Sequence, residues 1–329
     1  MISVDLIAFA FVRLLLAAIF LLIARQLFSW LTPYRLRHEI AEVDNPAFAV
    51  LYGGYILAIV FALAGALFGP TGQWSDDLVG ISTGAVAALL LTPLSMWLCD
   101  RVMLRSFVVQ QEICRDQNVG VAYVVGGAAV ATGLMLQGVL TGQSDGLWLM
   151  ARDIVVYWAC GQVLLLAAGW LFDLVTPFDL HERIEHDDNA AIGLAFGGFL
   201  VAEGLIVRAA LQGAGSDLFN ELAITAAIAT MGLFVLLGLA GILSRVFLPS
   251  VAITDELVRD RNVGVGAVVA IAFVAAAILT NAAVHQHEAT PVADITETHN
   301  EPDSSEFVDH PFDASALPQG ATAATRGGH

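Results

Sequence analysis

The chain contains no lysine, and all 14 of its basic residues are arginines. Charged residues make up only 14% of its 329 residues, whereas about 25% is usual in soluble domains. The arginines are outnumbered by 31 acidic residues, so the formal net charge is −17. This balance excludes a basic surface of the kind that binds nucleic acid, and no nucleic-acid partner is expected.

Cysteine is scarce, and the sequence lacks the common enzyme motifs. Cys99, Cys114 and Cys160 are odd in number and include no CxxC pair, so we expect neither a disulfide framework nor a metal site. The chain has no HExxH, no GxSxG and no phosphate-binding glycine loop. We therefore expect buried free thiols, and no enzymatic activity, catalytic residue or cofactor.

Long apolar runs dominate the sequence. The chain is 57% hydrophobic, with a mean hydropathy of +0.75. Its long runs reach or exceed the ~20 residues that a membrane helix requires, and they are too long and too poor in turn signals to be strands. We predict an all-α integral membrane protein with eight transmembrane helices, in contact with the lipid bilayer. The expected spans cover roughly residues 6–29, 47–69, 78–99, 119–141, 147–172, 190–212, 222–248 and 263–284.

A unit of two helices recurs four times along the chain. Its markers are four asparagines separated by 73, 71 and 73 residues, each of which follows a charged segment and precedes an apolar run. Such a period indicates that one structural unit was duplicated. We expect a first four-helix membrane repeat at residues 1–144 and a second at 145–284. The markers are Asn45, Asn118, Asn189 and Asn262.

The arginines predict how the chain is oriented. Ten of the fourteen flank or occupy the segments before the asparagines, whereas the opposite loops contain only Arg152. The positive-inside rule places these segments in the cytoplasm, with both termini in the periplasm of a bacterium and the chain in its inner membrane. Each unit has an even number of spans, so the repeats are parallel about an axis along the membrane normal. We expect two four-helix halves, or alternatively a pseudo-fourfold ring.

The segments before the asparagines are amphipathic. Apolar residues recur at i and i+4, as in Val109 and Ile113, which predicts a short helix on the cytoplasmic interface. Each asparagine would then cap the long helix that follows, an effect worth ~1 kcal/mol. The alternative is that the four asparagines, together with Asp116, Asp187 and Asp260, ring a cytoplasmic vestibule.

Pairs of glycines lie two turns inside the spans that follow the asparagines. Small residues let membrane helices approach each other closely, so these glycines predict tight helix packing. The fourth unit has Ala270 and Ile271 at this place, and its contact must differ. The glycines are Gly53, Gly54, Gly126, Gly127, Gly197 and Gly198.

Two residues of opposite charge fall inside apolar spans. Arg13 lies about 12 Å and Glu203 about 13 Å from the outer ends of their helices, at a rise of about 1.5 Å per residue. A charge at mid-bilayer costs ~2.5–3.5 kcal/mol, so each residue needs a partner or water. We predict an ion pair between Arg13 and Glu203, which either fixes how the halves dock or belongs to a permeation or proton path.

Three further polar residues occupy one equivalent position in units two, three and four. Gln137, Arg208 and Asn281 could together line a cavity, or each could bond a neighbouring helix. Arg208 lies close enough to the outer end of its span to extend its guanidinium to the interface.

The C-terminal segment differs from the rest of the chain. Residues 285–329 hold eight acidic residues and the single basic residue Arg326, and they are rich in Pro, Thr, Ser, Ala and Gly. This composition predicts a disordered acidic tail, on the periplasmic side in the orientation above.

The repeated pattern resembles the YjfL-like bacterial inner-membrane family, also described as domain of unknown function 350. The resemblance rests on the segments ending in Asp44-Asn45 and Asp188-Asn189 and on the Gly-Gly helices that follow them. It covers about residues 5–284 and implies four-span units, present twice, in a bacterial inner membrane. It implies no catalytic residues.

The sequence favours one function and leaves a second as the alternative, and the charges kept inside the membrane decide the order. One is a channel or transporter-like conductor of ions or small polar solutes, which the parallel repeats and the polar residues inside the membrane favour. The other is a non-transporting scaffold or envelope-stress adaptor that docks partners through its cytoplasmic amphipathic segments. Assembly into a homo-oligomer and docking of a cytoplasmic or periplasmic protein are both compatible with the sequence.

Overall fold

The computed structural model describes residues 4–32, 35–69, 74–142, 146–211 and 218–288, and for residues 4–6 and 284–288 it describes the backbone alone. Residues 289–329 lie outside this description, and with them most of the expected acidic tail. Residues 1–287 form one compact unit.

Eight long helices of the described chain are apolar enough to cross a membrane, which confirms the predicted spans. They differ from the prediction only by a few residues at their ends, where a helix can extend into the interface at little cost. They are α1 (Val4–Leu31), α2 (Pro46–Phe68), α3 (Trp74–Leu98), α5 (Val119–Leu140), α6 (Leu147–Val175), α8 (Ala190–Ala210), α9 (Leu218–Phe247) and α11 (Val263–Glu288). These helices pair into units one (α1, α2), two (α3, α5), three (α6, α8) and four (α9, α11).

Short helices precede the second long helix of every unit. Units two to four have α-helical segments whose apolar residues face the protein, as the amphipathic pattern predicts, whereas the segment of unit one is a π-helix with no buried residue. A further π-helical turn, η2 (Cys99–Met103), continues α3. The short segments are η1 (His38–Glu42), α4 (Val109–Cys114), α7 (Leu180–Glu185) and α10 (Ile253–Val258).

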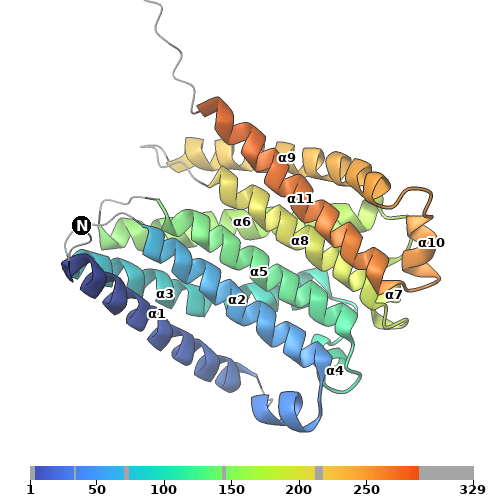
Figure 1. The fold of residues 1–329 in the computed structure, drawn as a ribbon, viewed down its shortest axis with the longest axis horizontal. Helices are drawn as coiled ribbons and strands as arrows, with labels where there is room; N and C mark the ends of the chain where they lie inside the picture. Colours follow the sequence, from blue (N-terminus) through green and yellow to red (C-terminus); the bar gives the residue numbers. More distant parts are fainter. Residues whose placement is uncertain (1–3, 33–34, 70–73, 143–145, 212–217, 289–329) are drawn as a thin grey trace, which may run out of the picture. The chain divides into compact units, whose positions relative to one another are not determined.

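The second helices of the four units form a row in the order α2, α5, α8, α11 (Figure 1). All four begin at the end of the bundle that carries the short segments, which we call the anchor end (Figure 1). The helices inside the row are enclosed, with 89% of the α5 span and 72% of the α8 span buried. The parallel direction of these helices follows from the two spans in each unit, which return the chain to the same side before every repeat.

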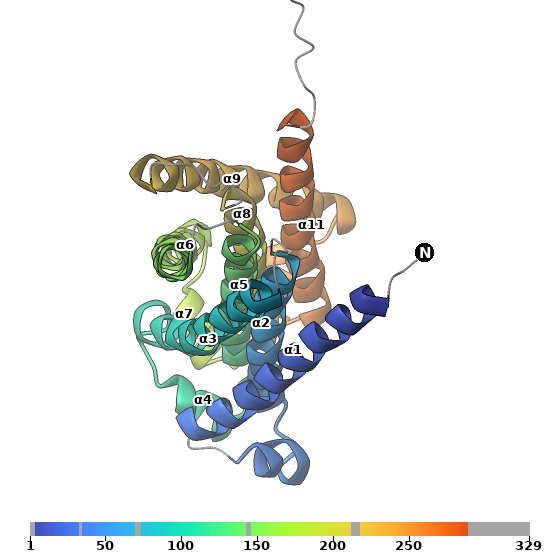
Figure 2. The ribbon, with the colours of Figure 1, turned by 90° about the vertical axis from the view of Figure 1, so that its left-hand side faces the viewer.

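The first helices of the units flank this row. Seen along the bundle, α3, α6 and α9 lie around α5 and α8, while α1 packs chiefly on α2 and α3 (Figure 2). Only 11% of the α1 span is buried. Its outward residues, such as Phe11 and Leu22, are apolar and 66% exposed, as expected for a surface that faces lipid.

The row has two open ends and does not close into the pseudo-fourfold ring considered from the sequence. On α2, a side chain added at Gly53 would meet no atom within 4 Å. On α11, Ile271 is 60% exposed. If α2 and α11 were in contact, Gly53 and Ile271 would be covered, as their equivalents are at the internal junctions. The order of units in the sequence is therefore also their order in space.

Candidate functional site

The most regular feature of the structure lies at the anchor end, in the turn before each asparagine. The residue preceding the asparagine has a positive φ in all four units, with values of 56°, 53°, 47° and 48°. Non-glycine residues rarely adopt this left-handed conformation, yet two aspartates, a glutamine and an arginine adopt it here. The turn lets the backbone reverse and start the long helix. These residues are Asp44, Gln117, Asp188 and Arg261.

Each asparagine caps the helix that follows. The Oδ1 of Asn45 accepts a hydrogen bond from the backbone N–H of Phe48 at 3.0 Å, and that of Asn118 accepts one from Val121 at 3.1 Å. Asn189 and Asn262 make the same contact. Free N–H groups at the start of a membrane helix are thereby satisfied.

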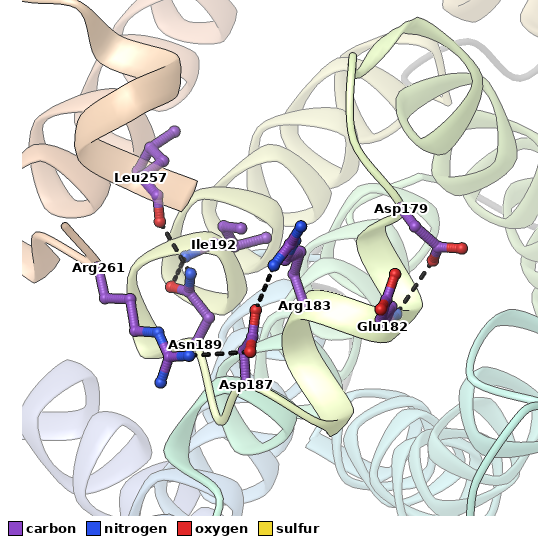
Figure 3. A network of polar contacts seen from close by, with 8 residues as sticks. All are labelled: Asp179, Glu182, Arg183, Asp187, Asn189, Ile192, Leu257 and Arg261. Atoms are coloured by element: carbon purple, nitrogen blue, oxygen red, sulfur yellow. Dashed lines mark hydrogen bonds and ion pairs between the residues drawn. The ribbon is translucent and has the colours of Figure 1, made fainter. Parts of the chain in front are cut away.

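The other end of the same amide joins one unit to the next. The Nδ2 of Asn45 donates to the carbonyl of Ile113 at 3.0 Å, and that of Asn118 donates to the carbonyl of Ile184 at 2.7 Å. Asn189 donates in the same way to the carbonyl of Leu257 at 2.8 Å (Figure 3). We call these three bonds the asparagine ladder.

The ladder is buried and linear. Asn45, Asn118 and Asn189 are 1%, 2% and 0% exposed. Because both ends of each amide are engaged by backbone groups, these asparagines form a packed line and not the open ring of a vestibule. The vestibule interpretation from the sequence is therefore wrong for these three residues.

In three units the asparagine also bonds a glutamate. Asn45, Asn118 and Asn262 each donate a hydrogen bond to the glutamate six residues earlier, over 3.1, 3.0 and 2.9 Å. In unit three Arg183 replaces this glutamate, and it forms an ion pair with Asp187 at 2.7 Å. Asp187 also pairs with Arg261 of unit four at 2.8 Å (Figure 3).

The electrostatics of the anchor end differ between neighbouring units. Burial raises the pKa of Glu112, and the nearby Asp116, Glu185 and Asp188 raise it further, whereas the hydrogen bond from Asn118 lowers it. The hydrogen bond from Arg183, together with Arg261, lowers the pKa of Asp187 despite partial desolvation. The junction of units two and three is therefore acid-rich, and that of units three and four is balanced by arginine.

Glycines bring the helices of the row into backbone contact. A methyl group added at Gly54 would lie 2.6 Å from the Cα of Gly126, and one added at Gly127 would lie 2.6 Å from the carbonyl oxygen of Gly197. At Gly198 the neighbour is the Cβ of Ala270, at 2.4 Å. The second small residue of each unit thus meets the first of the next unit, and the alanine of unit four still fits.

The same contact continues along the helices. A methyl group at Gly133 would lie 2.4 Å from the carbonyl oxygen of Ala58, and one at Gly65 would lie 2.6 Å from the Cα of Gln137. Together with the glycine pairs, these contacts span α2 and α5 from the anchor end almost to the opposite end. Helices packed at this distance leave no room for a file of water between them.

A cavity of about 560 Å³ lies at the opposite end, among the ends of α1, α2, α3, α5 and α6. Its lining includes Arg13 and three aspartates, Asp76, Asp77 and Asp153. Arg13 donates a hydrogen bond to the carbonyl of Leu67. We call this the Arg13 cavity; its lining carries more negative than positive side chains.

The structure does not bring Arg13 and Glu203 together. The ion pairs of the described residues include neither side chain. Arg13 is on α1, which packs on α2 and α3, whereas Glu203 is on α8, which packs on α5, α6 and α9. The prediction matched the depth of the two residues in the membrane, but depth does not determine lateral position.

The repeat relates Arg13 to one of the aspartates that line its cavity. The position of Arg13 corresponds to Tyr157, and that of Asp77 corresponds to Glu221, both at the offset of 144 residues. The Tyr157 hydroxyl donates a hydrogen bond to Glu221. Arg13 and Asp77 line one cavity at the corresponding place in the first half. The sequence supplies the offset, and the structure supplies the Tyr157–Glu221 contact that gives it meaning.

Glu203 occupies an apolar site. Its side chain is 1% exposed, and its Oε2 has no hydrogen-bond partner among the described residues. The corresponding residue of unit two is Thr132, which accepts a hydrogen bond from Gln162 at 3.0 Å. Such interhelical bonds, and that from Trp158 to Ser95 at 2.9 Å, were not expected from the sequence because they depend on the rotation of each helix.

The polar residues Gln137, Arg208 and Asn281 face the preceding unit of the row. The backbone of Gln137 lies against Gly65, and that of Arg208 lies against Gly138. The Nδ2 of Asn281 donates to the carbonyl of Leu205 at 3.0 Å. Of the two interpretations from the sequence, bonding to a neighbouring helix is seen for the side chain of Asn281.

Comparison with known proteins gives one match. A family model described as Domain of Unknown Function (DUF350) matches residues 1–140 and, a second time, residues 144–284. No curated protein and no solved structure matches significantly.

Proposed function

The chain belongs to the DUF350 family, with the domain present twice, and from this premise we propose that it is a non-conducting membrane scaffold. The observation that carries the proposal is the row of helices itself. The asparagine ladder and the glycine contacts join every unit to the next through backbone atoms. Such a row resists the helix movements on which gated conduction depends, and it presents the anchor ends of four units along one edge.

The anchor end is the docking surface in this proposal. Arginines concentrate there, so we assign it to the cytoplasm and both termini to the periplasm of a bacterial inner membrane. Its outward side chains include Arg37, whose side chain is 89% exposed, and Arg259, which is 73% exposed. These arginines flank short helices that Asn45 and Asn189 hold in place, so a partner would meet a preformed surface.

A flux assay and a cross-linking assay together test the scaffold. Proteoliposomes should pass K⁺, Cl⁻ and H⁺ no faster than protein-free liposomes under voltage and pH gradients. A photocrosslinking amino acid in place of Arg37 should give a discrete protein adduct in cells. The matched control replaces Phe234, which is 63% exposed on the apolar face of α9, and should react with lipid alone. Ion-selective flux above the liposome background would refute the proposal.

One observation favours a second candidate, the binding and passage of a small cationic solute. The Arg13 cavity, at about 560 Å³, is large enough for such a solute and has three aspartates in its lining. If solute passes through it, replacing Asp77 with Asn should abolish the flux, whereas Arg152→Ala outside the cavity lining should not. Equal flux in both variants would exclude the cavity as the route.

A further inference from the structure

The same contact between neighbouring units occurs three times inside the row, and the outer faces of units one and four each carry one side of it. At every internal junction, the second small residue of one unit meets the first small residue of the next. The asparagine of the earlier unit also donates to a carbonyl in the short helix of the later unit. Among these four units, unit one makes the contact only with unit two, and unit four makes it only with unit three.

The exposed face of unit one is built to receive another unit. Ala49, Gly53, Leu57 and Val60 are exposed along the outer face of α2, and the two nearest the anchor end are small. In units two and three the equivalents of Gly53 are Gly126 and Gly197, which lie in the internal junctions.

The exposed face of unit four carries the complementary half. Gly264 and Ile271 are exposed on α11, and their equivalents in the earlier units lie in the junctions. Asn262 is also exposed. The Nδ2 groups of Asn45 and Asn118 each donate two bonds, one to a glutamate and one to a carbonyl of the next unit. The Nδ2 of Asn262 donates to Glu256, and among the described residues it makes no bond to a carbonyl of another unit.

We propose that copies of this chain associate head to tail, with α11 of one copy packed in parallel against α2 of the next. At the anchor end the register is the one used inside the chain: Gly264 lies against Ala49, and the Nδ2 of Asn262 reaches the carbonyl of Ile40, the equivalent of Ile113. Two turns further along, Ile271 has a side chain where the internal junctions have glycine, so α11 and α2 lie farther apart at Gly53 than neighbouring helices inside the row do. The contact is heterologous, so it produces a ring or an open filament of copies.

A second copy fits this face better than lipid does. Lipid tails would fill the apolar part of this face, whereas a second copy would also offer a carbonyl oxygen to the second N–H of Asn262. The face also continues an interface that already holds the four units of one chain together. The contact depends on neither of the two functions considered above, so its test is separate from theirs.

One pair of residues at the new junction carries like charges. By the internal register, Asp260 of one copy would approach Asp44 of the next, where the third junction has Asp187 and Arg261. The second junction already places Asp116 and Asp188 at these positions, so the fold accepts two acids there. Asp260 is also paired with Arg259 of its own chain at 2.9 Å.

Disulfide cross-linking between two tagged forms of the chain tests the register. Both forms first have Cys99, Cys114 and Cys160 replaced by alanine; one then carries Ala49→Cys and the other Gly264→Cys. The first internal junction has alanine at both equivalent positions, Ala47 and Ala122, so the new residues add only a sulfur atom each. Oxidation of membranes from cells that produce both forms should give a dimer that carries both tags.

The matched control moves one cysteine out of register. Val60→Cys lies eleven residues from position 49, or about 16 Å along the helix, and should not cross-link to Gly264→Cys. Cross-linking only between chains with the same tag would show a symmetric contact and overturn the proposal. A mixed dimer no more abundant than in the control would show that lipid covers the face, and would also overturn it.

A second measurement does not depend on disulfide chemistry. Neither Gly53 nor Gly238 on α9 has an atom within 4 Å of an added Cβ, so leucine at either place should leave the single chain intact. The mass of the protein in lipid nanodiscs should fall to that of a single chain for Gly53→Leu and remain that of an assembly for the wild type and Gly238→Leu. A wild-type protein that is a single chain under these conditions would overturn the proposal.

Discussion

The side-chain amide of Asn118 donates a hydrogen bond to the carbonyl oxygen of Ile184, 2.7 Å away and 66 residues later in the sequence. The same amide caps α5 through its oxygen. One side chain thus starts a membrane helix and fixes the position of the next unit. Because the group is 2% exposed, water cannot replace either bond when the side chain is removed.

Removal of this amide should destabilise the protein more than removal of the amide at the end of the row. Asn118→Ala loses a cap worth ~1 kcal/mol and leaves buried backbone groups unpaired, at a further cost of ~1–3 kcal/mol. Asn262→Ala loses only an exposed cap and the exposed bond to Glu256. Thermal unfolding of the single chain in detergent should show a clearly larger fall in the midpoint for Asn118→Ala. Equal falls would show that the bond to Ile184 contributes no stability.

Alanine should have opposite effects at two glycines. In a helix interior alanine is favoured over glycine by ~1 kcal/mol, and Gly80 on α3 has open space around an added Cβ. Gly80→Ala should therefore raise the unfolding midpoint. At Gly127 the added Cβ would lie 2.6 Å from the carbonyl oxygen of Gly197, so Gly127→Ala should lower it. The contact between the two backbones is refuted if both variants gain stability.

Glycine should be stabilising in the turn before Asn118. Gln117 has a φ of 53°, a conformation that costs a non-glycine residue roughly 1 kcal/mol. Gln117→Gly should therefore raise the unfolding midpoint despite the greater freedom of glycine in the unfolded chain. Gln111, inside α4, is the control, and Gln111→Gly should lower the midpoint by the helix penalty. A loss of stability in both variants would show that the turn is not strained.

The raised pKa of Glu112 should make stability depend on pH. Burial is the main cause of the shift, so the folded protein binds this proton more tightly than the unfolded chain does. The carboxyl then costs no stability below its ordinary pKa of 4.5, and the cost grows as the pH rises from there through the raised value. Glu112→Gln keeps an acceptor for Asn118 and should remove this cost.

Unfolding midpoints measured from pH 4 upward would check this prediction. The wild type and Glu112→Gln should be equally stable near the acid end of the range, and the variant should be more stable near neutral pH. Curves that stay parallel over the whole range would contradict the assignment of the effect to Glu112.

Local patterns in the sequence predicted most of the fold. The eight spans follow from apolar length alone, and the position of Asn45 and its equivalents predicts a helix cap because a cap involves only residues within one turn. The packing role of the glycines was also accessible, since the pair recurs at one depth. These patterns could not predict which helices are in contact within the plane of the membrane.

The error over Arg13 and Glu203 has this physical origin. Residues at one depth lie in a plane that cuts eight helices, and sequence distance does not say which helices touch. The 66-residue bond from Asn118 to Ile184 was invisible for the same reason. The repeat can relate a contact in one half to a pair of residues in the other half only when both positions are moved by the same offset. The correspondence of Arg13 and Asp77 with Tyr157 and Glu221 is such a case.

The open-ended row has a consequence for how this protein can vary in size. Joining Asn45 directly to Val119 would excise two membrane-spanning helices, α2 and α3, with the short segments η2 and α4. The cap of one repeat would then precede the long helix of another, and the chain would still cross the bilayer an even number of times. Insertion of an extra copy would likewise preserve every existing boundary. Chains of this architecture can therefore lengthen or shorten by whole modules without changing the side on which either terminus emerges.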